Sequence, residues 1–274
     1  MRPFEFGLQF VAMDGPEPVR ELARRAEDLG WSEVSTPDHV GLPDPFVSLA
    51  VAAEATTTVR IGTLVVNNEL HHTGLLARSA ATLDAMSGGR FVLGLGTGYQ
   101  RSEHDAIGVE LREPGPRVDR FEGAVLGLRS LLDAGRADLD HGGVSLHVED
   151  LGIRPARRVP LLIGGHGRRV VSIAGRHADT FQFTGLTHAD GSGDPTPGGF
   201  VWEQLVERRR WLDESAGDRI DEIDVSALVQ VVHVGDGADE ARAETAERLG
   251  VDDEAIDLLP FVLVGTVDQI VEKL

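Results

Sequence analysis

The sequence predicts an α/β fold, a single (β/α)8 TIM barrel with insertions in its βα loops that spans residues 1–274. Three observations predict it. Apolar strand-like segments alternate with helical segments, eight such segments can be identified, and neither a linker nor a break in composition separates them. Continuous apolar strands alternating with helices are typical of a parallel sheet. The length of 274 residues suits a barrel, which needs about 250. An open doubly wound sheet is the alternative.

The expected strands are short, apolar and rich in Val, Ile, Leu and Phe. They span Phe4–Phe10, Glu33–Thr36, Arg60–Val66, Phe91–Leu95, Pro160–Ile163, Asp179–Phe183, Val225–Val234 and Phe261–Val264. Between them, apolar residues recur at helical spacing. Helices are expected at Pro18–Leu29, Phe46–Thr58, Leu75–Met86, Phe121–Leu132, Arg168–His177, Trp202–Leu212, Ala238–Leu249 and Thr266–Leu274.

Glycine and proline mark several boundaries of these elements. Gly30 follows the first helix as a C-cap would, Pro45 precedes the second, and Gly88-Gly89 ends the third. Residues 99–116 form a long polar segment, and residues 136–159 are expected to be an excursion from the barrel. The composition of residues 185–199 is typical of a loop. A loop of this length is often functional.

Composition excludes several classes of function. The formal net charge of −19 repels phosphate backbones, so nucleic acid is not an expected partner. No apolar run is long enough to span a membrane, and the first residues lack the apolar core of a signal peptide. Cysteine is absent, which removes disulfides and thiolate chemistry. A cytoplasmic protein that depends on a cofactor for any redox chemistry is expected.

Asp38-His39 follows the second expected strand. Catalytic groups of barrels lie at the carboxyl ends of strands, and histidine exchanges protons near neutral pH. His39 is therefore a candidate acid–base residue. The alternative reading makes Asp38 a cap and His39 its packing neighbour.

Two glycine-rich segments also follow strands. Gly94-Leu95-Gly96-Thr97-Gly98 offers a backbone that can approach a flat ring or a phosphate, or it simply forms a tight turn. A second segment precedes an expected helix, where amide groups and an arginine favour a phosphate. It consists of Gly164, Gly165, His166, Gly167 and Arg168. The alternative is a turn with its arginines in solvent.

The remaining histidines carry no assigned role. His71-His72 lacks the i, i+4 spacing of a helical metal pair, so no metal site is expected. Glu103-His104-Asp105, His141 and His147 lie in polar segments and are expected on the solvated surface.

Together these segments resemble the bacterial luciferase-like monooxygenase superfamily. The motifs are Thr36-Pro37-Asp38-His39, Gly62-Thr63-Leu64-Val65-Val66, the run from Ala81 to Gly98, and Gly164-Gly165-His166-Gly167. The chain is most similar to actinobacterial members that use the deazaflavin coenzyme F420, and users of flavin mononucleotide (FMN) share the motifs. The resemblance implies one luciferase-like barrel and a homodimer that associates through the helices after the second and third strands.

The resemblance also implies roles for individual residues. The coenzyme ring would lie against a bulge with a cis peptide bond between Leu64 and Val65, and Asp38 would contact it. Asn67 would reach the coenzyme tail, while Gly164, Gly165 and His166 would hold its phosphate. His39 matches the proton-handling histidine of the family. Tyr99 stands where the sugar-phosphate dehydrogenases of the family carry a catalytic glutamate, which argues against glucose 6-phosphate.

Three functions are consistent with these residues. The first is an F420-dependent oxidoreductase that transfers a hydride between the coenzyme and an organic substrate. The second is an FMN-dependent monooxygenase that uses reduced flavin and O2. The third is a coenzyme-binding protein without catalytic activity.

Overall fold

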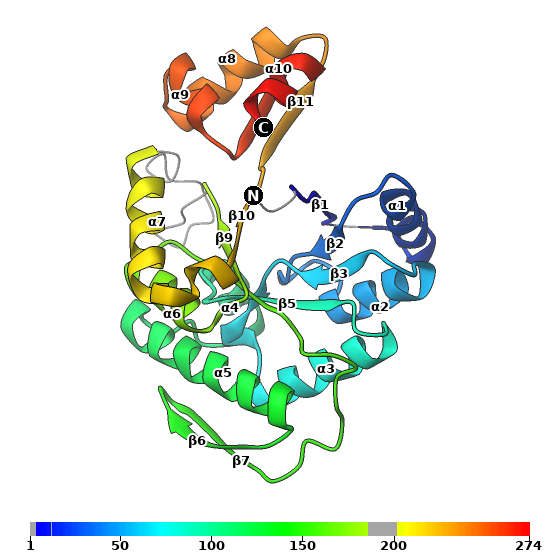
Figure 1. Ribbon diagram of the computed structural model, residues 1–274, viewed down its shortest axis with the longest axis vertical. Helices are drawn as coiled ribbons and strands as arrows, with labels where there is room; N and C mark the ends of the chain where they lie inside the picture. Colours follow the sequence, from blue (N-terminus) through cyan, green and yellow to red (C-terminus); the bar gives the residue numbers. More distant parts are fainter. Residues whose placement is uncertain (1–3, 12, 186–201) are drawn as a thin grey trace. The chain divides into compact units, whose positions relative to one another are not determined.

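The protein is described by a computed structural model that places residues 4–11, 13–185 and 202–274. Its contacts divide the chain into two compact units, whose helices and strands are labelled in Figure 1. The first comprises Met1–Gly98, Glu103–Ile163 and His177–Asp179, and the second Tyr99–Ser102, Gly164–Arg176 and Thr180–Leu274. The expected α/β class is confirmed. A single domain and a closed (β/α)8 barrel stay predictions.

The first unit contains a curled parallel sheet with the strand order β1-β2-β3-β5-β8. Apolar side chains such as Leu93 and Leu95 of β5 are fully buried in its core. The strands are β1 (Gly7–Gln9), β2 (Glu33–Thr36), β3 (Arg60–Thr63), β5 (Phe91–Gly96) and β8 (Leu161–Gly164). Five of the expected strands are therefore present, although the first is shorter than predicted.

The expected strand Arg60–Val66 is interrupted. Pairing of β3 with β5 ends at Gly62↔Val92, and β4 (Val66–Asn67) resumes it at Val66↔Leu95. The peptide bond between Leu64 and Val65 is cis, as the family resemblance implied. The Leu64 N–H donates to the Thr36 carbonyl at 2.9 Å, and Gln9 Nε2 donates to the Leu64 carbonyl at 2.6 Å. The bulge is thus bonded to both β1 and β2.

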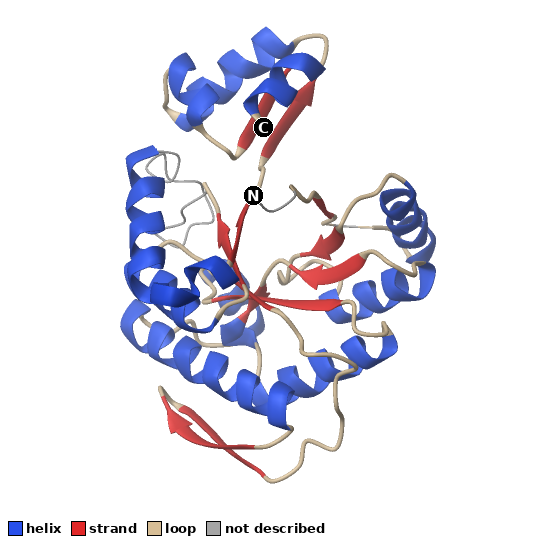
Figure 2. Ribbon diagram, viewed as in Figure 1, coloured by secondary structure: helices blue, strands red, loops and turns tan. Residues whose placement is uncertain are grey.

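Helices of the first unit pack in succession, with α1 against α2, α2 against α3 and α3 against α5 (Figure 2). Their apolar faces are rich in alanine, which allows close approach. The helices are α1 (Pro16–Asp28), α2 (Pro45–Ala55), α3 (Thr73–Met86) and α5 (Pro114–Ala134). Proline in the first turn begins α1, α2 and α5. The helix α5 therefore begins seven residues earlier than the apolar pattern indicated.

A short helix and a hairpin were not predicted. A short helix, α4 (Arg101–Ile107), lies in the polar segment after β5. Residues 136–159 contain an antiparallel hairpin of β6 (Ala137–His141) and β7 (Val144–Val148). The turn residues Gly142 and Gly143 have φ of 60° and 81°, as a two-residue hairpin turn requires. The hairpin packs on α5 at Gly123, where a Cβ would lie 2.2 Å from the His141 carbonyl oxygen.

The second unit corrects the seventh expected strand, Val225–Val234. It is two strands, β10 (Asp224–Ala227) and β11 (Val231–Val234). β10 pairs in parallel with β9 (Thr180–Phe183), whereas β11 pairs in parallel with β12 (Val262–Gly265). The chain changes partner between them, because the Leu228 N–H bonds to Phe183 and the Gln230 N–H to Phe261.

Helices complete the second unit. They are α6 (Arg168–His177), α7 (Trp202–Ala216), α8 (Ala238–Leu249), α9 (Asp253–Leu258) and α10 (Val267–Lys273). Of these, only α9 was not expected. The predicted loop at residues 185–199 lies almost wholly outside the described residues. Within the part of the chain that is described, no helix is long and apolar enough to cross a membrane.

Glu27 of α1 caps the turn that leads into β3. Its carboxylate accepts the backbone N–H groups of Thr57, Thr58 and Val59 and the Thr58 hydroxyl. Burial disfavours the charged form, but these bonds outweigh it and lower the pKa of Glu27 from 4.5 to about 2. A pKa that is lower in the folded than in the unfolded chain stabilises the fold above the unfolded value. That stability is lost as the pH falls from 4.5 toward about 2.

The substitution Glu27→Gln is expected to lower the free energy of unfolding at pH 7 by about 1–2 kcal/mol, because the bonds to a charged acceptor are lost. It should also flatten the fall in stability between about pH 5 and about pH 3. Urea unfolding across this range measures both effects, with Glu21→Gln on the exposed face of α1 as the control. An unchanged pH dependence in Glu27→Gln would contradict the assignment.

Candidate active site

His39 follows β2 and is held by a carboxylate that the sequence did not reveal. Its Nδ1 lies 2.7 Å from Glu103 Oε1, while Glu103 Oε2 accepts the Val40 N–H at 3.1 Å. The Glu103 side chain is 10% exposed and that of His39 30%. Because a carboxylate only accepts when ionised, His39 Nδ1 carries a proton. This leaves Nε2 as the ring nitrogen whose protonation state changes during acid–base chemistry.

The expectation that Glu103 and His104 are solvated surface residues is wrong. Both lie on α4 and are buried. The segment has no apolar run, so its polarity suggested exposure. Its buried side chains instead bond to polar groups at the ends of β2 and β4. Glu103 and His39, for example, are 64 positions apart in the sequence. The one available signal was the presence of a glutamate shortly after β5.

Asp38 connects the end of β2 with the segment after β4. Its Oδ2 accepts the Asn67 N–H at 3.0 Å and lies 2.8 Å from His71 Nε2. The Asp38 side chain is 11% exposed and that of His71 25%. Asp38 therefore forms a second carboxylate–histidine pair, and its proposed contact with a coenzyme ring stays a prediction.

Asn67 is buried and engaged with protein groups. Its Oδ1 accepts the Glu69 N–H at 3.1 Å, and its Nδ2 lies 3.1 Å from His104 Nε2. His104 Nδ1 lies 3.2 Å from the Val109 carbonyl oxygen. A neutral His104 with its proton on Nδ1 satisfies both contacts. The expected contact of Asn67 with a coenzyme tail stays a prediction.

A buried ionic cluster supports the turn between Asn67 and His71. The Glu69 side chain is fully buried and lies 2.9 Å from Arg112 Nη1 and 3.3 Å from Arg120 Nη1. Arg120 also donates to the carbonyl groups of Asn68 and His71 at 2.6 and 2.7 Å. Burial lowers the pKa of Arg120, and the charge of Glu69 opposes this change. These bonds fix the turn that presents Asn67 and His71.

The glycines of β5 allow close packing against β3 and β4. A Cβ on Gly94 would lie 1.9 Å from the Thr63 carbonyl oxygen, and one on Gly96 2.7 Å from Val65 Cγ2. Gly98 has φ of 78°, and a Cβ there would lie 2.1 Å from Asn67 Oδ1. Close packing at Gly94 and Gly96 and the positive φ at Gly98 thus account for these glycines. Coenzyme contacts of Gly96, Thr97 and Gly98, and of Leu64 and Val65 beside them, stay predictions.

The segment 164–167 belongs to the second unit and precedes α6, whose first residue is Arg168. The first helical bond runs from the Val171 N–H to the Gly167 carbonyl at 3.0 Å, so the N–H groups at the helix start precede the helical ladder. A Cβ on Gly165 would lie 2.6 Å from Val170 Cγ1, whereas one on Gly167 would meet nothing within 4 Å. The Arg168 side chain is 67% exposed and lies 3.6 Å from Glu214. Anion binding by this segment, including Gly164 and His166, stays a prediction.

Among the described residues, no group of three or more His, Asp or Glu side chains could hold a metal ion. The pairs His39–Glu103 and His71–Asp38, after β2 and β4, offer groups for acid–base chemistry.

Comparison with known sequences gives a match over almost the whole chain. A family profile described as luciferase-like monooxygenase matches residues 3–257. An F420-dependent glucose-6-phosphate dehydrogenase from Nakamurella multipartita is 31% identical over 239 residues, which are 84% of this chain and 68% of that protein. A 5,10-methylenetetrahydromethanopterin reductase from Methanolobus tindarius is 25% identical over 268 residues, 98% of this chain and 74% of that protein.

Solved structures share the fold. The coenzyme F420 dependent tetrahydromethanopterin reductase from Methanopyrus kandleri has a TM-score of 0.78 and 22% identity, covering 98% of this chain and 88% of that chain. A monooxygenase from Streptomyces bottropensis has a TM-score of 0.76 and 22% identity, covering 98% of this chain and 87% of that chain. The fold is therefore common to F420-dependent reductases and to monooxygenases.

Proposed function

Since this chain belongs to the luciferase-like monooxygenase family, we propose that it is an F420-dependent oxidoreductase that transfers a hydride between F420 and an organic substrate. The observation that carries the proposal is the buried Glu103 bonded to His39, an acid–base pair in a chain whose relatives are named F420-dependent enzymes. Hydride transfer to or from an alcohol or carbonyl needs such a partner for the proton.

We infer that each unit, taken by itself, offers residues suited to one part of the coenzyme, its phosphate or its ring. Amide groups at the start of α6, with the exposed Arg168 and the open backbone at Gly167, are donors suited to a phosphate. Gly164, Gly165 and His166 would complete this part. In the first unit, the backbone of Leu64 and Val65, with Asp38, Asn67 and Gly96-Thr97-Gly98, would hold the ring and its tail.

F420, when bound, supplies the ring carbon that accepts or donates the hydride. His39 moves the proton. In oxidation of an alcohol, His39 Nε2 takes the hydroxyl proton as the hydride leaves the carbon, and in reduction it returns a proton to the carbonyl oxygen. Glu103, held by the Val40 N–H at 3.1 Å, keeps the imidazole oriented and stabilises its protonated form, as carboxylate partners of catalytic histidines do.

An FMN-dependent monooxygenase is the second candidate, because a monooxygenase of this fold has a TM-score of 0.76. Coenzyme titration separates the two functions. We expect F420 fluorescence to be quenched at lower protein concentration than FMN fluorescence. Arg168→Ala should weaken binding by about tenfold through loss of a charge-assisted contact, whereas Arg176→Ala, at the other end of α6, should not. A preference for FMN would favour the monooxygenase, and binding of neither would overturn the proposal.

The substrate class can be tested with three compounds. Glucose 6-phosphate, methylenetetrahydromethanopterin and a secondary alcohol are offered with the coenzyme, and its absorbance reports turnover. Turnover of any one of these compounds would support an enzymatic function. F420 binding without turnover of these compounds, unaffected by His39→Ala, would favour a coenzyme-binding protein without catalytic activity.

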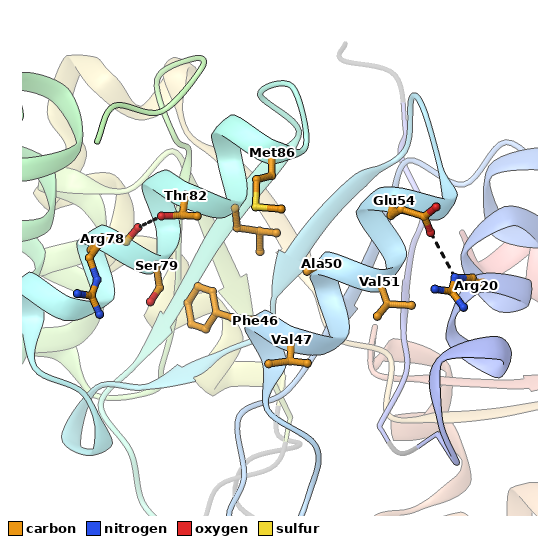
Figure 3. A pocket seen from close by; sticks show the side chains of 11 residues that line it. Arg20, Phe46, Val47, Ala50, Val51, Glu54, Arg78, Ser79, Thr82 and Met86 are labelled. Carbon is orange, nitrogen blue, oxygen red and sulfur yellow. Dashed lines mark hydrogen bonds and ion pairs between the residues drawn. The ribbon is translucent and has the colours of Figure 1, made fainter. Parts of the chain in front are cut away.

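We also propose that two copies associate through α2 and α3. A groove of about 520 Å³ on these helices is lined by Phe46, Val47, Ala50 and Met86 (Figure 3). Val47 is 66% exposed and Met86 73%. Arg20 and Glu54 lie 3.2 Å apart at one end of it, so an apolar strip is bordered by both charges. A surface of this kind can pair with its own copy about a twofold axis.

Sedimentation is expected to show a dimer that Val47→Glu dissociates, because a buried unpaired carboxylate opposes association. Val206→Glu on α7, at a valine that is 52% exposed, should leave the dimer intact. A monomeric wild type at micromolar concentration would contradict the dimer.

A further inference from the structure

Arg208 of α7 is a buried cation. It is 4% exposed, and among the described residues it is the only buried arginine. Burial lowers its pKa, and the charge of the neighbouring Glu207 opposes this change only in part. Arginine is seldom buried unless a carboxylate pairs with it, because an unpaired charge loses its hydration without compensation. The position of Arg208 therefore calls for a counter-charge.

In the described part of the chain, Arg208 has only uncharged partners. Its Nη1 donates to the Thr184 carbonyl at 3.4 Å, and its Nη2 donates to Gln204 Oε1 at 2.9 Å. The carboxylate of Glu207, the preceding residue, lies 3.8 Å from Arg210 instead. A guanidinium carries five N–H groups. The two bonds therefore leave most of these donors without an acceptor among the described residues.

Arg90 shows how uncharged groups can satisfy an arginine fully. Its side chain is half-buried, and its guanidinium makes five hydrogen bonds. The acceptors are the carbonyl groups of Ala53, Thr56, Val59 and Ser87 and the Thr56 hydroxyl. Arg208 is more deeply buried than Arg90 but has far fewer acceptors among the described residues. A purely structural role explains Arg90 and does not explain Arg208.

Arg208 reaches the carboxyl end of β9, because Thr184 directly follows that strand. The segment 164–167 lies at the carboxyl end of β8, the neighbour of β9 in the sheet. Ligands of parallel α/β folds bind outside the carboxyl ends of the strands. Thr184 and Gln204 are partly exposed, so the guanidinium lies close beneath the surface. Its uncompensated charge is therefore at an edge that a ligand can reach.

We propose that Arg208 binds an anionic group of the substrate, a phosphate or a carboxylate. Either group supplies the missing counter-charge, and its oxygens can accept two N–H groups of a guanidinium side by side. That the anion belongs to the substrate rests on the proposed function, in which the segment before α6 binds the coenzyme phosphate. The substrate is then an organic molecule with an acidic group besides the alcohol or carbonyl that exchanges the hydride.

The test is thermal unfolding in a chloride buffer to which inorganic phosphate is added. Sodium chloride at the same ionic strength corrects for screening. The proteins are wild type, Arg208→Met, Arg208→Lys and the control Arg209→Met. Arg209 lies on the same helix, and its side chain is 48% exposed and 2.8 Å from Asp213. Each protein is also made with Arg168→Ala, which removes the arginine of the proposed coenzyme site.

Without phosphate, Arg208→Met is expected to melt about 2–4 °C above the wild type, because it removes a buried charge that has no partner. Phosphate should raise the midpoint of the wild type and of Arg209→Met. The dissociation constant for phosphate, obtained from these shifts, should be about tenfold higher in Arg208→Met. Arg208→Lys keeps the charge but not the two parallel donors, so its value should lie between. Arg168→Ala should not remove this difference.

Titration with F420 identifies the molecule that carries the anion. If the anion belongs to the substrate, Arg208→Met should bind F420 as the wild type does, and the KM of an acidic substrate should rise about tenfold. Weaker binding of F420 by Arg208→Met would assign the anion to the coenzyme and overturn its assignment to the substrate. Turnover of a neutral alcohol with the same KM in both proteins would overturn it as well.

The anion site itself fails on two results. An equal response of wild type and Arg208→Met to phosphate, or no response of either, would show that Arg208 binds no anion. A midpoint of Arg208→Met below that of the wild type without phosphate would show that the chain itself compensates the charge. Inorganic phosphate needs no coenzyme, so these results are independent of the proposed function. Absence of F420 binding would overturn the proposed function and leave the phosphate result standing.

Discussion

Replacing His39 by alanine is expected to lower the rate of hydride transfer by about 10²- to 10⁴-fold, the range for removal of a general acid–base group. The affinity for F420 should change little, because the imidazole acts on the substrate proton. Stopped-flow absorbance of the coenzyme, with whichever test substrate turns over, measures the rate. The coenzyme titration described above measures the affinity.

Glu103→Gln separates orientation from proton transfer. The amide has a single acceptor oxygen, so it can take the place of the carboxylate toward the His39 Nδ1–H or toward the Val40 N–H but not both, and it cannot stabilise an imidazolium by charge. The rate should fall less than in His39→Ala, by about 10- to 100-fold, because the imidazole remains but has lost the charge of its carboxylate partner. His141→Ala on the β6–β7 hairpin is the control for loss of a histidine. A rate unchanged in His39→Ala would remove this residue from the mechanism.

Glu69→Gln is expected to destabilise the fold by about 3–5 kcal/mol, the cost of leaving a buried charge without its partner. The Glu69 side chain is fully buried, and that of Arg120 is 13% exposed. Removing the carboxylate leaves Arg120 with two backbone carbonyls as its acceptors and no compensating charge. Urea unfolding at neutral pH gives the change in free energy.

Two further variants show whether the penalty comes from the unpaired arginine. Arg112 is 39% exposed, so Arg112→Met should cost only about 1 kcal/mol or less, as expected for a partly solvated pair. Glu69→Gln combined with Arg120→Met should be less destabilising than the sum of the two single changes, because neither charge is left alone. Strict additivity of the two changes would show that the buried pair is not coupled.

Most elements of the fold could be predicted because their signals are local. Buried parallel strands are continuous apolar runs, as at Phe91–Leu95, and proline and glycine mark where helices begin and end. The elements that were predicted wrongly are those for which the local signal is missing or insufficient. Val225–Val234 is largely apolar, but its split into β10 and β11 depends on the Phe183 and Phe261 carbonyls, which lie in distant parts of the chain. The short helix α4 has no apolar periodicity to reveal it.

The sequence by itself determined the α/β class, the position of Asp38 and His39 at a strand end, and the family. Each is encoded in contiguous residues. Only the tertiary structure decided which carboxylate serves which histidine. His39 meets Glu103 across 64 positions, and Asp38 meets His71 across 33. Such pairs form because parallel strands end at one edge, where the loops and the turns that follow them fold together. The charges of the residues and their spacing along the chain do not determine which carboxylate pairs with which histidine. The buried neighbours that fix each side chain determine it.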